Sequence, residues 1–129
     1  MNYLIDTHIL IWYLENDKHL NSNYAEIIND KKHQPFVSSI SLWEIAIKMS
    51  LGKLKISVPF SELESFLFNH GFILQNFDFE DLNTLTKLPF HHGDPFDRLI
   101  ISQAISKNVP IITNDGKFDF YKNEGLKLL

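Results

Sequence analysis

The sequence contains no cysteine. Disulfide frameworks, cysteine zinc ligands and cysteine nucleophiles are therefore excluded. Basic residues are also in deficit, because 12 lysines and arginines face 16 aspartates and glutamates and leave a formal net charge of −4. A negatively charged chain repels nucleic acid, since neutralisation of phosphates dominates that binding. A function on nucleic acid would therefore need a local basic patch or bound metal ions.

Long apolar runs are missing as well. The longest run, Ile9 to Leu14, is far shorter than the roughly 20 residues that cross a bilayer. Asp6 interrupts the opening apolar stretch before a signal-peptide core could form. No low-complexity tract, linker or repeat divides the chain. We therefore expect a cytoplasmic protein without membrane segments, folded as a single domain over residues 1–129.

Short apolar strands alternate with helical patterns along the chain. The predicted strands are residues 2–6, 35–38, 72–74, 110–113 and 126–128, and the connector 54–58 could form a further small strand. The predicted helices cover residues 7–16, 22–31, 41–52, 59–71, 78–88 and 96–107. Strands that are apolar throughout and separated by helices favour a parallel sheet covered on both faces. The fold class is therefore α/β, with the strand order left open.

Four acids fall where such a fold would gather them. Asp6 and Asp115 follow predicted strands, whereas Glu44 and Asp97 lie in the first turns of predicted helices. In open parallel sheets, ligands bind beyond the carboxyl ends of the strands. Mg²⁺ and Mn²⁺ prefer oxygen ligands, which carboxylates supply. We therefore expect one or two of these ions to bind at this edge of the sheet.

Each acid also has an ordinary structural explanation. Asp6 and Asp94 could cap the helices that follow them. Glu44 and Ser41 have the spacing of a capping box. Asp115 could belong to a simple turn. Taken singly the acids favour these explanations, but their joint placement favours a metal site.

Four stretches of the chain stand in a characteristic order. They are residues 6–12 (DTHILIW), 41–48 with 51–54 (SLWEIAIK and LGKL), 88–100 (LPFHHGDPFDRLI) and 113–115 (TND). Together they resemble the PIN-domain ribonucleases, and more narrowly the VapC-type toxins of type II toxin–antitoxin pairs. The resemblance runs from Asn2 to about Tyr121, which is nearly the whole chain.

The resemblance implies a three-layer α/β/α fold with a central, mainly parallel sheet. It also implies an Mg²⁺- or Mn²⁺-dependent endoribonuclease that hydrolyses RNA phosphodiester bonds and is inhibited by a cognate antitoxin. A homodimer is expected mainly on the same ground. The catalytic, metal-binding acids would be Asp6, Glu44, Asp97 and Asp115. The neighbouring positions that would orient the site are Thr7, Thr113, Asn114 and Asp94, the last of these favoured as an N-cap.

Basic residues near these motifs are candidates for RNA binding. Lys48, Lys53 and Lys55 form the densest basic stretch, and Arg98 is the only arginine. Contact with RNA competes with a simpler explanation for Lys48 and Arg98, because each follows an acid by four residues and could pair with it on a helix. Both explanations stay open for these side chains.

Two alternatives to a metal-dependent nuclease are kept. His8, His91 and His92 could activate a ribose 2′-hydroxyl without metal, because histidine titrates near neutrality. The chain could also be a catalytically silent, metal-stabilised protein-interaction module of the same fold. A signalling receiver domain and an aspartate-nucleophile phosphatase are disfavoured, because Asp6 has no acidic neighbour and His8 stands where a second acid would be needed.

Overall fold

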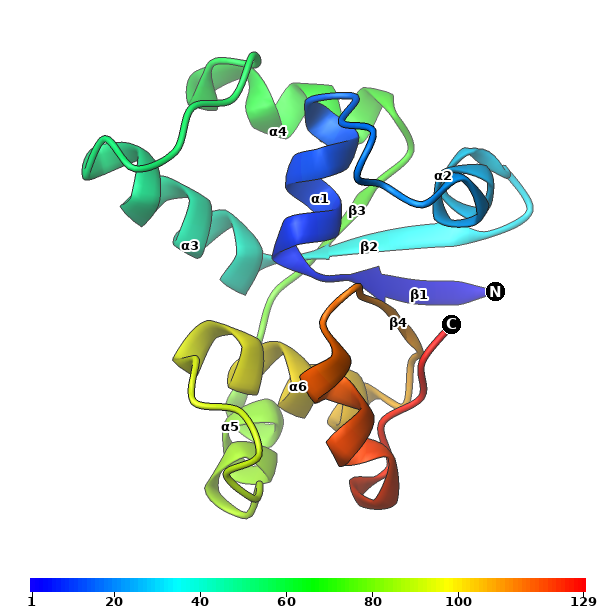
Figure 1. Cartoon of the computed structure of the whole chain (residues 1–129), viewed down its shortest axis with the longest axis vertical. Helices are drawn as coiled ribbons and strands as arrows, with labels where there is room; N and C mark the ends of the chain where they lie inside the picture. Colours follow the sequence, from blue (N-terminus) through cyan, green and yellow to red (C-terminus); the bar gives the residue numbers. More distant parts are fainter.

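A four-stranded parallel sheet forms the centre of the computed structural model, which describes all 129 residues (Figure 1). The strands are β1 (Asn2–Ile5), β2 (Gln34–Ser38), β3 (Ile73–Gln75) and β4 (Ile111–Ile112). They lie in the order β3-β2-β1-β4, and every pairing is parallel. Parallel neighbours need crossover connections, which the helices supply.

Helices cover both faces of this sheet. They are α1 (Thr7–Leu14), α2 (Ser22–Asn29), α3 (Ser39–Ser50), α4 (Phe60–Asn69), α5 (Phe79–Thr86), α6 (Pro95–Lys107) and the 3₁₀ helix η1 (Gly116–Glu124). Helices α1 to α4 lie on one side, and α5, α6 and η1 lie on the other (Figure 1). The predicted three-layer α/β/α class with a parallel sheet is thus confirmed. None of the helices combines the length and apolar character needed to cross a bilayer.

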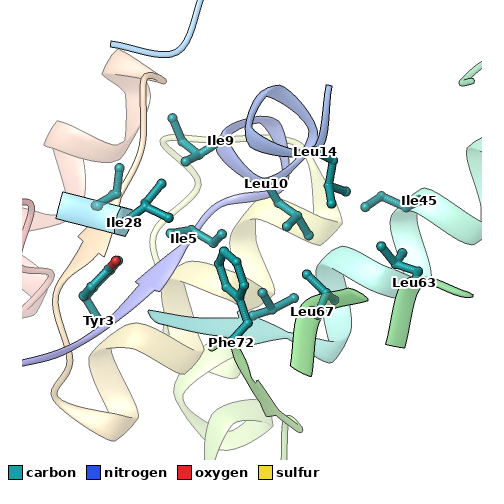
Figure 2. Packing of buried hydrophobic residues seen from close by; sticks show 12 residues of the cluster. Tyr3, Ile5, Ile9, Leu10, Leu14, Ile28, Ile45, Leu63, Leu67 and Phe72 are labelled. Atoms are coloured by element: carbon teal, nitrogen blue, oxygen red, sulfur yellow. The ribbon is translucent and has the colours of Figure 1, made fainter. Parts of the chain in front are cut away.

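Alternation along β1 divides the core between the two faces. Tyr3 and Ile5 pack under α1 to α4, and Leu4 packs against α6 and η1. Figure 2 shows Leu10 and Phe72 in the first of these clusters, whose side chains are all buried. Burying one large apolar side chain contributes roughly 1.5–3 kcal/mol. Strand β1 is therefore held from both sides, which fixes the residue that follows it.

Side-chain caps start three helices at strand ends or loops near one edge of the sheet. The Asp6 carboxylate accepts the Ile9 N–H at 2.8 Å and begins α1. The Ser38 hydroxyl accepts the Ile40 N–H at 3.1 Å and begins α3. Asp94 accepts a backbone N–H in the first turn of α6, so its predicted N-cap is confirmed.

The start of α3 corrects one prediction. The sequence placed the cap at Ser41, but the helix begins at Ser39 and Ser38 caps it. Ser41 is buried inside the helix, where its hydroxyl oxygen accepts a hydrogen bond from the Thr7 hydroxyl at 2.9 Å. The capping box between Ser41 and Glu44 is therefore wrong, because both residues lie within the helix.

Two other predictions about local structure also differ from the observed structure. Residues 54–58 form no strand, and the closing strand at 126–128 is reduced to a single bridge between Leu128 and Ile111. Helix η1 was not predicted. Its buried Phe118 and Tyr121 are three residues apart, which puts them on one face of a 3₁₀ helix but makes no α-helical stripe.

Candidate metal centre

The four acids that the sequence singled out converge at the carboxyl edge of the sheet. Asp6 follows β1 directly, and Asp115 lies three residues beyond the end of β4. Asp97 is in the first turn of α6, and Glu44 is in the middle of α3. Hydrogen bonds through Thr113 connect Asp6 to Asp115, and His92 Nε2 lies between Asp115 and Asp97. Burial is the largest cause of the raised pKa of Asp97, and the charge of Glu44 is near enough to contribute to it. The structure therefore brings together carboxylates from four separate parts of the chain.

Asp6 is fixed by hydrogen bonds to both of its oxygens. Oδ1 accepts the Ile9 N–H, and Oδ2 accepts the hydroxyl of Thr113. The same hydroxyl oxygen accepts the Asp115 N–H at 3.0 Å, so Thr113 ties the ends of β1 and β4 together. Burial raises the pKa of Asp6 even though these hydrogen bonds oppose the shift. Asp6 is thus a buried, oriented carboxyl at the centre of the site.

Glu44 carries the clearest sign that a ligand belongs here. Its Oε2 accepts a hydrogen bond from Lys48 Nζ at 2.7 Å, but its buried Oε1 has no partner. A buried acceptor without a partner costs about 1–3 kcal/mol. A hard cation is the group that an array of carboxylate oxygens satisfies, so the donor set fits Mg²⁺ or Mn²⁺.

Asp97 shows the cost of gathering these acids. Burial, followed by the negative charge of Asp94, raises the pKa of Asp97 to about 7, although the neighbouring His92 opposes the shift. The metal-free site therefore does not hold all its carboxylates in the charged form near neutral pH. A divalent cation would remove this repulsion.

His92 is a site residue that the sequence reasoning placed in a loop. Its ring is buried, and Nε2 lies 2.8 Å from Asp115 Oδ2 and 3.1 Å from Asp97 Oδ2. One candidate ligand atom from each of these three residues lies within 4.8 Å of the others. Burial alone would raise the pKa of Asp115, but hydrogen bonds from the Lys117 N–H and from His92 hold it below its usual value. The sequence feature that could have identified His92 as a site residue is its position two residues before Asp94, the N-cap of α6.

His8 and His91, the other two histidines considered for a mechanism without metal, lie on the surface. His8 is exposed on α1, and its ring packs near Trp12. His91 is exposed and packs against the rings of Phe120 and Tyr121. Of the three histidines, His92 is the one that contacts the acids through its ring.

Arg98 requires a correction. It was expected to contact RNA or to pair with an acid, but it is only 6% exposed. Its Nη1 donates to the carbonyl oxygens of Pro89 and His92 at 2.8 and 3.4 Å, and Nη2 donates to Leu88 O at 3.1 Å. The guanidinium is therefore used inside the protein, where it holds the 88–92 loop, and it is not available to a phosphate.

The remaining predicted residues divide into buried and exposed groups. Thr7 is buried and joins α1 to α3 through Ser41. Asn114 is exposed next to Asp115. The other candidate basic residues are Lys48, which is paired with Glu44, and Lys53 and Lys55, which are exposed after the end of α3.

The raised pKa of Asp97 predicts how the stability of the metal-free protein depends on pH. Because the folded protein binds this proton more tightly than the unfolded chain, stability is lost as pH rises from about 4 toward about 7. The raised pKa of Asp6 acts in the same direction. We expect thermal melting in a chelator to give a higher Tm at about pH 5.5 than at about pH 8. A Tm that rises over this interval would contradict the prediction, and Asp97→Asn should flatten the profile.

Fold and site together define an α/β/α protein with an acidic centre suited to a divalent cation. The chain belongs to the PIN domain family, whose model matches residues 3–124. Proteins of this family are generally nucleases. No curated protein sequence matches the chain significantly.

Three solved structures are similar to this chain over its whole length. VapBC2 from Rickettsia felis, bound to a DNA fragment from its promoter, has a TM-score of 0.72 and 23% identity, covering 100% of this chain and 98% of that one. VapBC-1 from nontypeable Haemophilus influenzae has a TM-score of 0.67 and 19% identity, with 100% and 97% covered. DNA-bound VapBC from Salmonella typhimurium has a TM-score of 0.68 and 18% identity, with 100% and 97% covered. At these identities, the similarity concerns the fold.

Proposed function

We propose that this PIN domain is a VapC-type toxin that acts in the cytoplasm as a metal-dependent endoribonuclease. The observation that carries the proposal is the gathering of four carboxylates, one of which, Glu44, has a buried oxygen without a partner. A protein interior does not retain such an array for stability, because burial and neighbouring negative charges raise the pKa of Asp97 and of Asp6. Membership of a family of nucleases supports the same conclusion.

Asp6, Glu44, Asp97 and Asp115 would hold Mg²⁺ or Mn²⁺, in one or two ions. When bound, such an ion would lower the pKa of a water molecule and would stabilise negative charge on the phosphate. Other groups of the protein orient these carboxylates. Thr113 and the Ile9 N–H fix Asp6, and His92 lies between Asp97 and Asp115.

Exposed side chains beside the acids suit single-stranded RNA. Trp43 is 53% exposed and packs edge to face on Phe96 with 5.2 Å between ring centroids. These two aromatic residues immediately precede Glu44 and Asp97 in the sequence. Unpaired bases stack on such rings, whereas the bases of a duplex are not accessible to them.

Lysines in α3 and in the segment that follows it would supply the positive charge that the chain as a whole lacks. We propose that Lys48, Lys53 and Lys55 contact the RNA backbone, with Asn114 as a hydrogen-bonding neighbour of the acids. Each phosphate contact adds to the salt dependence of binding. Arg98 is left out of this set because its donors are occupied inside the protein.

A cognate antitoxin is the proposed partner, because the similar solved structures are VapBC complexes. An apolar groove of about 700 Å³ between α4 and β3 would be covered in such a complex or in the homodimer that we also propose. Phe68, which is 79% exposed, lines this groove together with Leu74 of the edge strand. Apolar surface of this kind marks interaction sites. Light scattering of the purified chain, alone and with a co-expressed antitoxin, tests both states.

Cleavage of RNA with and without metal tests the proposed activity. The purified chain should cut a single-stranded RNA in Mn²⁺ or Mg²⁺ and leave the matching duplex largely intact. EDTA should abolish cleavage, and the products should carry 5′-phosphate and 3′-hydroxyl ends. Asp6→Asn should be inactive yet folded, because asparagine caps a helix as well as aspartate does. Glu62→Gln, which neutralises an exposed acid in the first turn of α4, is the control.

Two other outcomes would contradict the proposed activity, each in its own way. Cleavage that survives EDTA and leaves 2′,3′-cyclic phosphate ends would favour attack by the ribose 2′-hydroxyl. A rise in Tm with Mn²⁺ but no cleavage would favour the silent, metal-stabilised interaction module.

A further inference from the structure

The His92 side chain is held in one orientation by contacts on several sides. The residue is 7% exposed, and its backbone N–H donates to the Tyr121 hydroxyl oxygen at 2.8 Å. Its carbonyl oxygen accepts a hydrogen bond from Arg98 Nη1. Its ring packs edge to face against Phe118, with 6.0 Å between the centroids. Neither the backbone nor the ring is free to turn.

The backbone of Asp94 determines which ring nitrogen of His92 carries the proton. The Asp94 N–H donates to His92 Nδ1 at 3.1 Å. An N–H can only donate, so Nδ1 must present its lone pair. In a neutral imidazole, one nitrogen accepts and the other carries the hydrogen, so the proton is on Nε2.

The protonated Nε2 faces two carboxylates of the candidate metal centre. It lies 2.8 Å from Asp115 Oδ2 and 3.1 Å from Asp97 Oδ2, so one N–H is shared between them. This single donor satisfies one oxygen on each acid.

We propose that His92 is a positioning residue, a fixed hydrogen-bond donor that holds Asp97 and Asp115 at the spacing a divalent cation requires, and that it is not itself a ligand of that cation. The inference rests on the proposed metal centre. Distances alone would allow a different interpretation, in which His92, Asp97 and Asp115 are three metal ligands, one nitrogen and two carboxylate oxygens. Ligation through Nε2 needs a lone pair there, which would move the proton to Nδ1, directly against the Asp94 N–H.

The tautomer of His92 can be observed directly by NMR. A long-range ¹H–¹⁵N correlation spectrum distinguishes a protonated ring nitrogen from one with a free lone pair. We expect a protonated Nε2 and an unprotonated Nδ1 in the metal-free protein, and the same pattern after saturation with Mg²⁺. A ring protonated on both nitrogens, or a proton that moves to Nδ1 when Mg²⁺ binds, would overturn the inference.

Substitutions at position 92 test the effect on metal binding without measuring activity. His92→Ala should weaken Mn²⁺ binding by about 10–100-fold, as loss of a residue that orients metal ligands does. His92→Gln presents an amide N–H near the position of Nε2 and should restore most of the affinity. The control is His91→Gln, which changes the exposed neighbour and should bind Mn²⁺ like the wild type. Melting curves of the metal-free proteins establish that each variant is folded.

The outcomes separate this inference from the proposed nuclease activity. His92→Ala that binds Mn²⁺ as tightly as the wild type would overturn the positioning role, and so would His92→Gln that binds as weakly as the alanine variant. A wild-type protein that binds Mn²⁺ with the expected tautomer but cleaves no RNA would support the role of His92 and contradict the nuclease activity alone.

Discussion

Asp97→Asn is expected to lower metal-dependent RNA cleavage by on the order of 10³-fold or more, because a metal ion contributes several kcal/mol of transition-state stabilisation. Asp97 lies in the first turn of α6. Burial raises its pKa, and the negative charges of Asp94, Asp6 and Glu44 add to that shift. Asparagine keeps the shape of the side chain and still accepts a hydrogen bond from His92. It removes the charge that would attract the cation.

Initial rates of RNA cleavage at saturating Mn²⁺ measure the effect of Asp97→Asn. The variant should also melt at a higher temperature than the wild type at about pH 8 in a chelator, because it no longer buries a charged carboxylate at position 97 beside other acids. Loss of activity together with gain of stability excludes misfolding as the cause. A rate within about tenfold of the wild type would contradict a metal-binding role for Asp97.

Arg98→Ala is expected to lower the free energy of unfolding by about 3–5 kcal/mol, since each buried carbonyl left without a donor costs about 1–3 kcal/mol. The guanidinium donates to the carbonyl oxygens of Leu88, Pro89 and His92, of which Pro89 O also accepts from the Tyr121 hydroxyl, so the loss falls on Leu88 and His92. It also lies 3.6 Å from the centroid of the Phe90 ring. Arg98→Lys should be nearly as damaging, because a single ammonium does not reproduce the planar fork.

Urea denaturation of the metal-free protein measures this loss for the arginine variants. Total stabilities of domains are about 5–15 kcal/mol, so the alanine variant could lose much of its folded population. Lys53→Ala removes an exposed positive charge and should change stability by no more than about 0.5 kcal/mol. A loss below about 1 kcal/mol for Arg98→Ala would mean that the loop carbonyls find other donors.

Much of the fold could be predicted because its signals are local. Apolar strands separated by helical stripes gave the α/β class, and the pair Asp94 and Pro95 marked the start of α6 correctly. The start of α3 was misplaced because Ser38, Ser39 and Ser41 all suit a helix cap. The hydrogen bond between Ser41 and Thr7, 34 residues apart in the sequence, uses Ser41 in the core, and no local pattern contains that contact.

The site could be predicted only where a residue type signalled its own chemistry. Acids next to strand ends are visible in a sequence, and the Glu44–Lys48 pair follows from helical spacing. The contact of His92 with Asp115 spans 23 residues, and its orientation depends on the Tyr121 hydroxyl 29 residues away. Arg98 was misjudged for a similar reason, because its carbonyl partners are backbone groups whose direction only the folded loop determines.

If the unpartnered oxygen of Glu44 binds the proposed cation, the stability of the folded protein would depend on the supply of that cation. A ligand that binds only the folded state adds about 1.4 kcal/mol for every tenfold excess over its Kd. A chain starved of divalent ions would open more often and present more of its backbone to proteases. Cellular metal levels would then set the abundance of the protein through its turnover, independently of how fast each molecule works.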